Sequence, residues 1–538
     1  MQFSLSPVTV FVGPNNSGKS RVLTEIDNYC SSGQQANSLV ISSMAFKSLP
    51  ENEANELIER LRVPLSSRDV IPAGQIIIGS RRGRTQVHEA QLRQFIKDVK
   101  LNVPAYAQWF LNHLVLKLDG QSRIGLINMQ GAGDLQQPPH TSLQVLFRDN
   151  VKRSEVRRIV KEAFGSYFVI DPTNIGHFRI RLAAKPPIDE VEERGLHEAA
   201  VEYHSRAQLI DEASDGVKAF TGIIIEFIAG DPKILLIDEP EAFLHPALAF
   251  NLGLEMSRAS LTSDKRIFVS THSPAFVMGC IQSGAPVNIV RLTYRNSSAT
   301  ARLLPSDELL TLMRNPLLRS TGVISGLFYE FVVITEADAD RAFYQEINER
   351  LLRLRPEWGI PNCLFLHAQN KQTVQTIMRP LRNLGIPAAA IVDIDVLKEG
   401  GLNWSSLLSA SGIPPLSHGA MASHRAAVVQ AFTYAGKDMK RDGGVEALEG
   451  SEKEAALNLL QSLSEYGTFV VPHGELEAWL KDLGSTGHGP NWLINVFELM
   501  GEDPDSASYV RPRDNDVWAF IAGVRSWLTN ASRKGIPA

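Results

Sequence analysis

The chain has 538 residues, of which 44% are hydrophobic and 21% charged, and its formal net charge is −5. That length is too great for one hydrophobic core, so we expect two or three domains. The negative charge gives no overall attraction to nucleic acid, so DNA binding would require local basic patches. No apolar run approaches the roughly 18 residues of a membrane span and no signal peptide is evident, which predicts a cytoplasmic protein without membrane contact.

The three cysteines lie far apart, at Cys30, Cys280 and Cys363. They show no C-x-x-C spacing and no neighbouring histidines at zinc-site distances, which argues against a disulfide framework or a structural zinc ion. We expect them to be small buried residues.

The first motif follows an apolar run at Val8–Val12 and reads G-P-N-N-S-G-K-S. A G-x-x-x-x-G-K-S loop between a strand and a helix points its backbone N–H groups at phosphate oxygens, and the helix adds the positive end of its dipole. Lys19 would reach the β- and γ-phosphates of ATP, and the Ser20 hydroxyl would ligate Mg²⁺. The predicted phosphate-binding residues are Gly13, Asn15, Asn16, Ser17, Gly18, Lys19 and Ser20.

About 190 residues separate this loop from the next motif, more than a minimal nucleotide-binding unit needs. We therefore expect a helical arm or dimerisation subdomain inserted at about 85–165. A basic run at 81–84 either touches phosphates or lies in a solvated loop. Apolar spacing predicts strands at 38–43, 75–78, 167–170 and 178–182 and helices at 52–62, 91–117 and 150–164.

The second block of motifs begins with Ser214-Asp215-Gly216-Val217-Lys218 before an apolar helix. The apolar strand 233–237 then ends in Asp238-Glu239-Pro240, and the strand 266–270 ends in Thr271-His272-Ser273. Carboxylates at the end of a buried parallel strand lie where α/β sheets bind ligands. We expect Asp238 to hold Mg²⁺, Glu239 to orient the attacking water and His272 to contact the γ-phosphate.

The order of these motifs, phosphate loop, S-x-G-x-K, D-E-P and T-H-S, resembles that of ATP-binding-cassette (ABC) ATPases of the SMC and Rad-fifty type over about residues 1–325. The resemblance implies that two heads pair head to tail in a homodimer or larger homo-oligomer. It also implies that Ser214 and Gly216 complete the ATP site of the other head, with His272 as the switch histidine. His245, within F-L-H-P, departs from the Asp of transporter-like members and is similar to the form in overcoming-lysogenisation-defect (OLD) nucleases.

A set of carboxylates follows the later strands predicted at 327–335, 388–392 and 468–471. Right-handed crossovers would make the strands parallel and bring these groups to one edge, where they would repel one another unless a divalent cation neutralised them. Oxygen ligands suit Mg²⁺ or Mn²⁺, and two such ions about 4 Å apart commonly support phosphodiester cleavage. The predicted metal ligands are Glu336, Asp340, Asp393, Asp395, Glu475 and Glu477, of which Glu336 and Asp393 are the predicted catalytic residues.

The alternative is that these acids cap helices and solvate loops, for which Asp338 and Asp340 are well placed.

The acidic pattern resembles a Toprim domain at about 326–484, with a helical extension at 485–538. Toprim proteins usually have Gly after the first Glu, where this chain has Ala337. OLD nucleases also use a catalytic Lys, for which Lys371, Lys398 and Lys481 are candidates.

An ABC-type ATPase followed by a Toprim domain resembles the OLD family of ATP-dependent endonucleases, so we expect an α/β chain with both folds. The resemblance implies metal-dependent cleavage or nicking of DNA, gated by ATP, in anti-phage defence or repair. The main alternative is a nucleotide sensor and scaffold with a degenerate Toprim domain that gates a separate effector protein. A DNA-clamping repair ATPase is a third possibility, against which the absence of long heptad arms argues.

Overall fold

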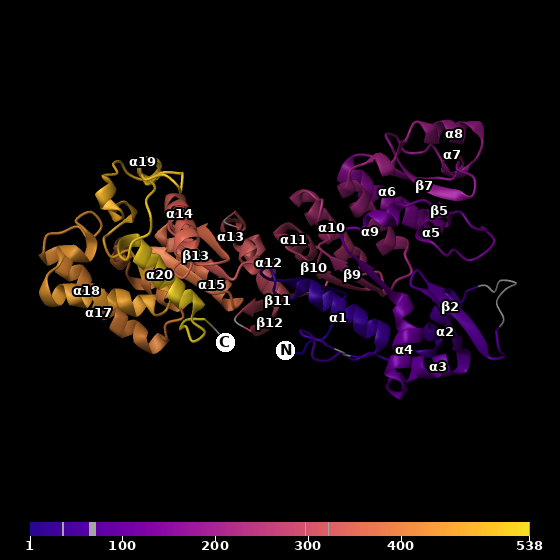
Figure 1. The fold of residues 1–538 in the computed structure, drawn as a ribbon, viewed down its shortest axis with the longest axis horizontal. Coiled ribbons are helices and arrows are strands. Elements are labelled where there is room, and N and C mark those ends of the chain that lie inside the picture. The colour runs from indigo at the N-terminus through magenta and orange to yellow at the C-terminus, as the bar shows by residue number, and fades with distance from the viewer. Residues whose placement is uncertain (35–36, 64–70, 296, 321, 537–538) are drawn as a thin grey trace. The chain divides into compact units, whose positions relative to one another are not determined.

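The computed structural model describes residues 1–34, 37–63, 71–295, 297–320 and 322–536. Its contacts divide the chain into two compact units. The first comprises Met1–Val12 and Asn16–Leu310, and the second comprises Thr311–Ala538 together with the short segment Gly13–Asn15. Each unit is built on its own sheet and is described by itself (Figure 1).

The first unit is centred on a six-stranded sheet with the strand order β12-β11-β1-β10-β9-β4. All neighbouring strands are parallel except β11 and β12, which are antiparallel. Because β1 lies inside the sheet and both faces are covered, all five of its residues are buried. The strand bounds are β1 Val8–Val12, β4 Val115–Leu118, β9 Ile234–Asp238, β10 Arg266–Ser270, β11 Val287–Arg295 and β12 Ser298–Leu304.

Helix α1 (Lys19–Ser32) contacts β10, β9 and β4 of this sheet (Figure 1). Its apolar residues Leu23 and Ile26 share a core with Leu236 of β9 and Phe268 of β10. The helix therefore begins immediately after the phosphate loop and is held against the strands that carry the later motifs. The other helices near these motifs are α9 Asp215–Ala229, α10 Pro246–Ala259 and α11 Pro274–Gln282.

The rest of the first unit consists of small sheets and helices beside this sheet (Figure 1). One is the hairpin of β2 (Gln75–Ser80) and β3 (Gly83–His88). Another sheet contains β5 Gln130–Gly131, β6 Tyr167–Asp171, β7 His177–Ala183 and β8 Gln208–Leu209. The helices of this region are α2 Glu51–Leu61, α3 Glu89–Lys97, α4 Val103–Trp109, α5 Ser142–Arg148, α6 Asn150–Phe164, α7 Glu190–Arg194 and α8 Glu198–Ser205. Helix α12 (Ser306–Arg314) begins in the first unit and ends in the second, which starts at Thr311.

Two sequence predictions in this unit are wrong. Residues 38–43 form no strand, because the N–H groups of Leu39, Val40 and Ile41 donate to the carboxylate of Glu25 rather than to another strand. The helix predicted at 91–117 does not extend to its predicted end, because residues 115–118 form β4 and their backbone pairs with β9 in the central sheet.

Two arginines of the basic run at 81–84 are neither phosphate contacts nor part of a solvated loop, the two alternatives that the sequence left open. Arg81 forms an ion pair with the buried Glu226, and Arg82 lies 2.6 Å from Asp27. Both side chains therefore join the hairpin of β2 and β3 to helices of the same unit.

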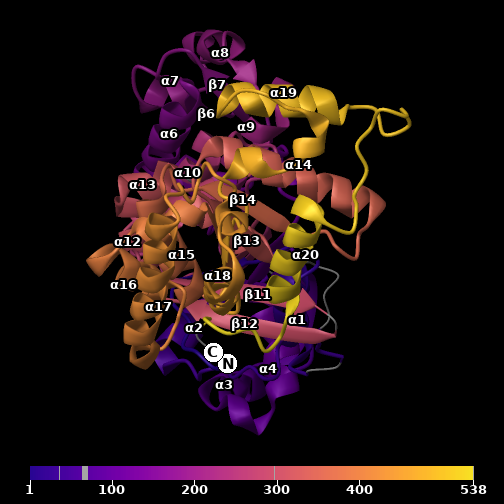
Figure 2. The same cartoon turned by 90° about the vertical axis from the view of Figure 1, so that its left-hand side faces the viewer.

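The second unit contains a four-stranded sheet with the order β14-β13-β15-β16, and every neighbouring pair is parallel, as predicted. In Figure 2 the sheet lies between α15 (Val374–Asn383) on one side and α20 (Asp516–Thr529) on the other. Helix α14 (Asp338–Leu354) contacts both β14 and α20. The strands are β13 Phe331–Thr335, β14 Cys363–His367, β15 Ala388–Val392 and β16 Thr468–Val470.

The strand predicted at 327–335 begins only at Phe331, because Val323–Phe328 form a 3₁₀ helix. Glu477 lies in a single 3₁₀ turn, Leu476–Ala478. The remaining helices are α13 Pro316–Ser320, α16 Gly401–Ala410, α17 Pro415–Tyr434, α18 Gly450–Ser464 and α19 Pro490–Met500.

The C-terminal helices belong to the core of the second unit. Trp492 of α19 and Trp518 and Trp527 of α20 pack in one apolar cluster with Phe331 of β13 and Phe343 of α14. Among the described residues, no helix combines the length and the apolar character needed to cross a bilayer. The three cysteines are free thiols, and Cys30 and Cys280 are buried as predicted.

Candidate functional site

The phosphate loop leaves β1 and enters α1 through backbone conformations that suit its sequence. Gly18 caps α1 in the left-handed region with a φ of 95°, and Asn16 adopts a φ of 61°. Asparagine and glycine tolerate this region better than other residues. The Ser17 hydroxyl is buried and has no hydrogen-bond partner among the described residues. A bound ligand could therefore supply the missing hydrogen bond.

Lys19 is the first residue of α1, and its side chain lies against the carboxylates that end β9. Only 5% of the residue is exposed. Burial lowers the pKa of Lys19 to about 8, although the negative charges of Glu239 and Asp238 oppose this shift. The ammonium group therefore lies in a partly desolvated setting, where its attraction to a phosphate is stronger than in bulk water.

Ser20 and Asp238, the two predicted Mg²⁺ ligands, are brought together by the pairing of the central strands. The Ser20 hydroxyl donates to Oδ1 of Asp238 at 3.0 Å. Ser270, at the end of the neighbouring β10, also donates to this oxygen. A hydroxyl and a carboxylate at the end of the phosphate loop are ligands that suit Mg²⁺.

Glu239 and His272 lie side by side at the ends of β9 and β10. Nε2 of His272 is 3.5 Å from Oε1 of Glu239, and the Glu239 N–H donates to the Ser270 carbonyl at 2.8 Å. Burial and the positive charge of Lys19 lower the pKa of His272, which favours the neutral imidazole. The structure thus brings together the carboxylate and the histidine that the sequence analysis assigned to the attacking water and the γ-phosphate.

The predicted trans residues Ser214 and Gly216 lie at the start of α9. Ser214 is exposed, whereas Gly216 is buried against the segment that follows D-E-P in the same chain. A Cβ atom on Gly216 would lie 2.6 Å from the Phe243 carbonyl oxygen, so only glycine permits this approach. His245 caps α10, accepting the Ala247 N–H at 3.4 Å.

The second unit gathers three of the predicted metal ligands at the carboxyl ends of β13 and β15. One carboxylate oxygen from each of Glu336, Asp393 and Asp395 lies within 4.8 Å of the others. Oε1 of Glu336 also accepts the backbone N–H of Asp393 at 3.0 Å. Oδ1 of Asp395 is buried without a hydrogen-bond partner among the described residues. This all-oxygen set fits Mg²⁺ or Mn²⁺.

Burial makes the charged forms of Glu336 and Asp393 unfavourable. Burial, followed by the charge of Asp393, raises the pKa of Glu336 well above its usual range. Burial also raises the pKa of Asp393, although the ammonium of Lys440 opposes this shift. Close carboxylates with raised pKa values are common at functional sites.

The other predicted ligands are divided between two settings. Asp340 caps α14, accepting the backbone N–H of Ala337 at 2.9 Å, as the capping alternative proposed. Glu475 and Glu477 form a second group with His488, which the sequence analysis did not include. Oε1 of Glu477 is 2.6 Å from Nδ1 of His488. The six predicted carboxylates therefore do not form one cluster.

Two lysines of the described part of the chain contact the acidic cluster. Lys371, one of the three candidates, lies 2.8 Å from Oδ2 of Asp395. Lys440 lies 2.8 Å from Oδ2 of Asp393 and 3.7 Å from Oε2 of Glu475. Lys398 instead pairs with Asp438, and Lys481 is exposed.

Nothing in the sequence marks Lys440, because it lies in an irregular segment with no periodicity or motif.

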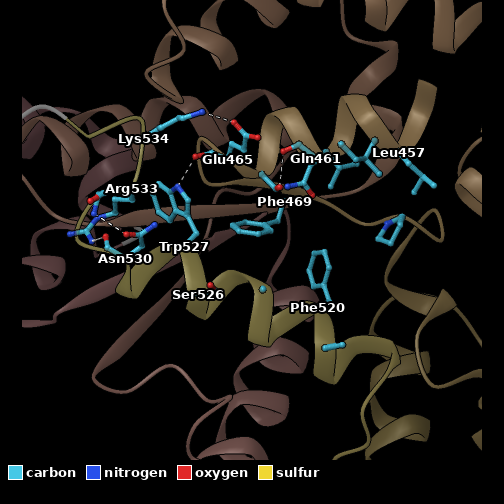
Figure 3. Close-up of a pocket in the computed structure, with 17 residues that line it drawn as sticks. Leu457, Gln461, Glu465, Phe469, Phe520, Ser526, Trp527, Asn530, Arg533 and Lys534 are labelled. Carbon is cyan, nitrogen blue, oxygen red and sulfur yellow. Dashed lines mark hydrogen bonds and ion pairs between the residues drawn. The ribbon is translucent and has the colours of Figure 1, made fainter. Parts of the chain in front are cut away.

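The second unit also contains a cavity of about 610 Å³ between α18, β16 and α20 (Figure 3). Phe469, Phe520 and Trp527 line it, and Lys534 at its rim forms an ion pair with Glu465 at 2.6 Å. None of the described residues that line this cavity belongs to the acidic cluster, so it is not part of the candidate metal site.

Residues 138–278 match the protein family described as "AAA domain, putative AbiEii toxin, Type IV TA system". The match covers α9, the D-E-P segment and the T-H-S segment, and it begins after the phosphate loop. No curated protein matches the chain.

Two solved structures of SMC heads are similar to it. The SMC head bound to the C-terminal winged-helix domain of ScpA is 14% identical, with a TM-score of 0.31, over 57% of this chain and 94% of that one. The SMC head domain from Thermotoga maritima is 13% identical, with a TM-score of 0.28, over 57% of this chain and 92% of that one.

Proposed function

We propose that the first unit is an ABC-type ATPase that binds ATP and Mg²⁺ at the phosphate loop. Lys19 neutralises the β- and γ-phosphates, and Ser20 and Asp238 hold the ion. Glu239 orients the attacking water, and neutral His272 contacts the γ-phosphate. The observation that carries this proposal is the convergence of Ser20, Asp238, Glu239 and His272 at the ends of adjoining strands, beside the buried Lys19.

The ATPase assignment is tested by Lys19→Ala, which we expect to abolish ATP hydrolysis. Lys233→Ala is the matched control, because Lys233 lies before the other end of β9 and pairs with Asp264. Hydrolysis by Lys19→Ala at the level of the unchanged protein would exclude this loop as the hydrolytic site.

We propose further that ATP joins two copies of the chain, with Ser214 and Gly216 of one copy completing the ATP site of the other. The exposure of Ser214 supports a direct contact with the other copy. Gly216 is buried against Phe243 of its own chain, so its part would be to let the start of α9 lie close to that segment. Sedimentation with ATP and Mg²⁺ tests it in the Glu239→Gln variant, in which ATP should persist. A strict monomer with ATP bound would contradict the proposal.

For the second unit, we propose a Toprim-type nuclease that cleaves or nicks DNA, in an OLD-family arrangement with a role in anti-phage defence. Glu336, Asp393 and Asp395 would hold Mg²⁺ or Mn²⁺, which supplies the activation of water and the stabilisation of the leaving oxygen in phosphodiester cleavage. The close approach of these three carboxylates, with a buried oxygen of Asp395 left unpaired, supports this function.

The nuclease is tested with supercoiled plasmid and Mg²⁺ or Mn²⁺, with and without ATP. We expect nicking that is lost in Glu336→Ala and Asp393→Ala. Asp338→Asn is the matched control. Asp338 lies two residues after Glu336, at the start of α14, but it is exposed and pairs with Arg341 at 2.7 Å. Absence of nicking in every condition, or nicking undiminished in both alanine variants, would contradict the proposed nuclease activity.

The second candidate function is an ATP sensor and scaffold that gates a separate effector protein. The ion pairs of Lys440 with Asp393 and of Lys371 with Asp395 favour it, because these lysines already supply part of the counter-charge that a metal would supply. Ala337 in place of the usual glycine favours it too. In that case the plasmid would stay intact while the ATPase remained active.

A further inference from the structure

Arg123 is buried behind the D-E-P turn of the first unit. It lies between β4 and a 3₁₀ helix at Ile124–Ile127, and its exposed fraction is 0%. Its Nη1 donates to the main-chain carbonyl of Glu239. Nε and Nη2 of the same guanidinium are buried and have no hydrogen-bond partner among the described residues. An arginine so fully buried and so incompletely paired calls for an explanation.

The carbonyl that Arg123 holds belongs to a residue in a strained conformation. Glu239 has a φ of 50°, in the left-handed region that non-glycine residues avoid. It also precedes Pro240, and a residue before proline favours an extended backbone. Such a conformation persists only where the surrounding structure holds it. The hydrogen bond from Arg123 and the bond from the Glu239 N–H to Ser270 provide that hold.

Glu241 lies two residues further along the same turn and offers a complementary unpaired group. Oε1 of Glu241 accepts the Thr271 hydroxyl at 2.8 Å and the His272 N–H at 2.7 Å. Oε2 is buried and has no partner among the described residues. The charge of Glu241 is also the strongest of those that attract the Arg123 guanidinium. Unpaired donors of Arg123 and an unpaired acceptor of Glu241 are therefore both buried at this turn.

Arg123 is also tied to the helix that begins with Ser214 and Gly216. The 3₁₀ helix after Arg123 packs against α9, and a Cβ atom on Gly222 of α9 would lie 2.9 Å from the Arg123 carbonyl oxygen. A displacement of α9 therefore moves Arg123, and through it the turn that carries Glu239.

We propose that Arg123 is a positioning residue for ATP hydrolysis that couples the place of α9 to the carboxylate of Glu239. In the present arrangement Arg123 holds the Glu239 carbonyl. A small shift of α9 brings Nε and Nη2 of Arg123 to Oε2 of Glu241. This movement changes the direction of the Glu239 side chain beside His272. The inference rests on the proposed role of Glu239 in hydrolysis.

The test measures the kcat and KM of ATP hydrolysis in Arg123→Met and Arg123→Lys. We expect Arg123→Met to lower kcat at least tenfold while KM changes less than threefold, because Arg123 touches no predicted phosphate ligand. Lysine should restore part of kcat, since it can still donate to the Glu239 carbonyl. Arg60→Met, on an exposed arginine of α2, is the control and should change neither constant.

Glu241→Gln provides a second measurement, which stands by itself if Arg123→Met does not fold. It should lower kcat at least threefold with KM unchanged, and the double variant should be no slower than Arg123→Met alone. An unchanged kcat in both single variants, or fully multiplicative effects in the double variant, would overturn the coupling. If Lys19→Ala and Glu239→Gln also kept full activity, the ATPase assignment itself would fail, and the two failures can therefore be told apart.

Discussion

Glu25 is the residue that best explains the local structure beside the phosphate loop. Its side chain is 5% exposed, and its carboxylate accepts the Ser38 hydroxyl and the N–H groups of Leu39, Val40 and Ile41. Val40 in turn lies 3.3 Å from the position that a Cβ atom on Gly18 would occupy. One carboxylate therefore satisfies the backbone of a segment that borders the loop.

We predict that Glu25→Gln loosens this segment in a pH-dependent way. Burial raises the pKa of Glu25, but the hydrogen bonds from Ser38, Leu39, Ile41 and Arg21 outweigh it and lower the pKa to about 2. A lowered folded-state pKa stabilises the fold above the unfolded value of about 4.5, and the contribution is lost as the pH falls towards 2. The expected loss at pH 7 is about 2–3 kcal/mol in local opening free energy.

Hydrogen exchange of the 39–41 amides, corrected for intrinsic rates, measures this effect at pH 7 and at pH 3. The difference between the variant and the unchanged protein should shrink at the lower pH. Glu53→Gln, on the exposed side of α2, should leave the amides unaffected at both values. A loss of equal size at pH 7 and pH 3 would show that the charge of Glu25 is not the cause.

We predict that Lys440→Met strengthens Mn²⁺ binding at the acidic cluster by about tenfold, because it removes a positive charge 2.8 Å from a predicted ligand. Isothermal titration with Mn²⁺ measures the affinity. Lys398→Met is the control, since Lys398 pairs with Asp438 and does not contact the cluster. Weaker Mn²⁺ binding by Lys440→Met would show that Lys440 supports the site rather than competing with the ion.

At the scale of elements, two glycines determine how closely α10 and α11 approach. A Cβ atom on Gly279 would lie 2.0 Å from the Phe250 carbonyl oxygen, and one on Gly253 would lie 2.4 Å from that of Phe276. These helices begin directly after His245 and Ser273. Their close contact therefore fixes the loop that carries His272 relative to the segment after D-E-P.

We predict that Gly279→Ala destabilises the first unit by about 3 kcal/mol, because backbone atoms must move to admit the methyl group. Gly419→Ala in α17 is the contrasting substitution, since no atom lies within 4 Å of the added Cβ. It should stabilise the second unit by about 0.5–1 kcal/mol, because alanine favours a helix over glycine. Urea unfolding followed by circular dichroism compares the two, and equal effects would contradict the packing argument.

At the scale of the whole molecule, each unit has its own sheet and core and its own candidate ion site. We predict two unfolding transitions in calorimetry. Relative to Mg²⁺ alone, ATP with Mg²⁺ should raise the temperature of only one transition, with a stabilisation of about 2.7 kcal/mol at a hundred times the Kd, and Mn²⁺ without ATP should raise the temperature of the other.

Lys19→Ala should remove the first shift and Glu336→Gln the second. A single transition that responds to both ligands would mean that the two units unfold as one.

The sequence alone was sufficient to predict features that depend only on the residues of one short segment. The phosphate loop, the D-E-P and T-H-S strand ends and the parallel order of the later strands follow from glycine placement and from apolar runs that end in polar residues. The proximity of Glu336 and Asp393 followed from the same reasoning, because parallel strands deliver their carboxyl ends to one edge.

Only the tertiary structure decided which groups pair across long stretches of chain. Residues 115–118 form a strand because their backbone pairs with β9. Residues 38–43 form none, because N–H groups of this segment donate to the carboxylate of Glu25. The tertiary structure also brought Lys440 to Asp393 and Arg123 to the Glu239 carbonyl. These contacts depend on how separate elements meet in space, and no local pattern of residues records that information.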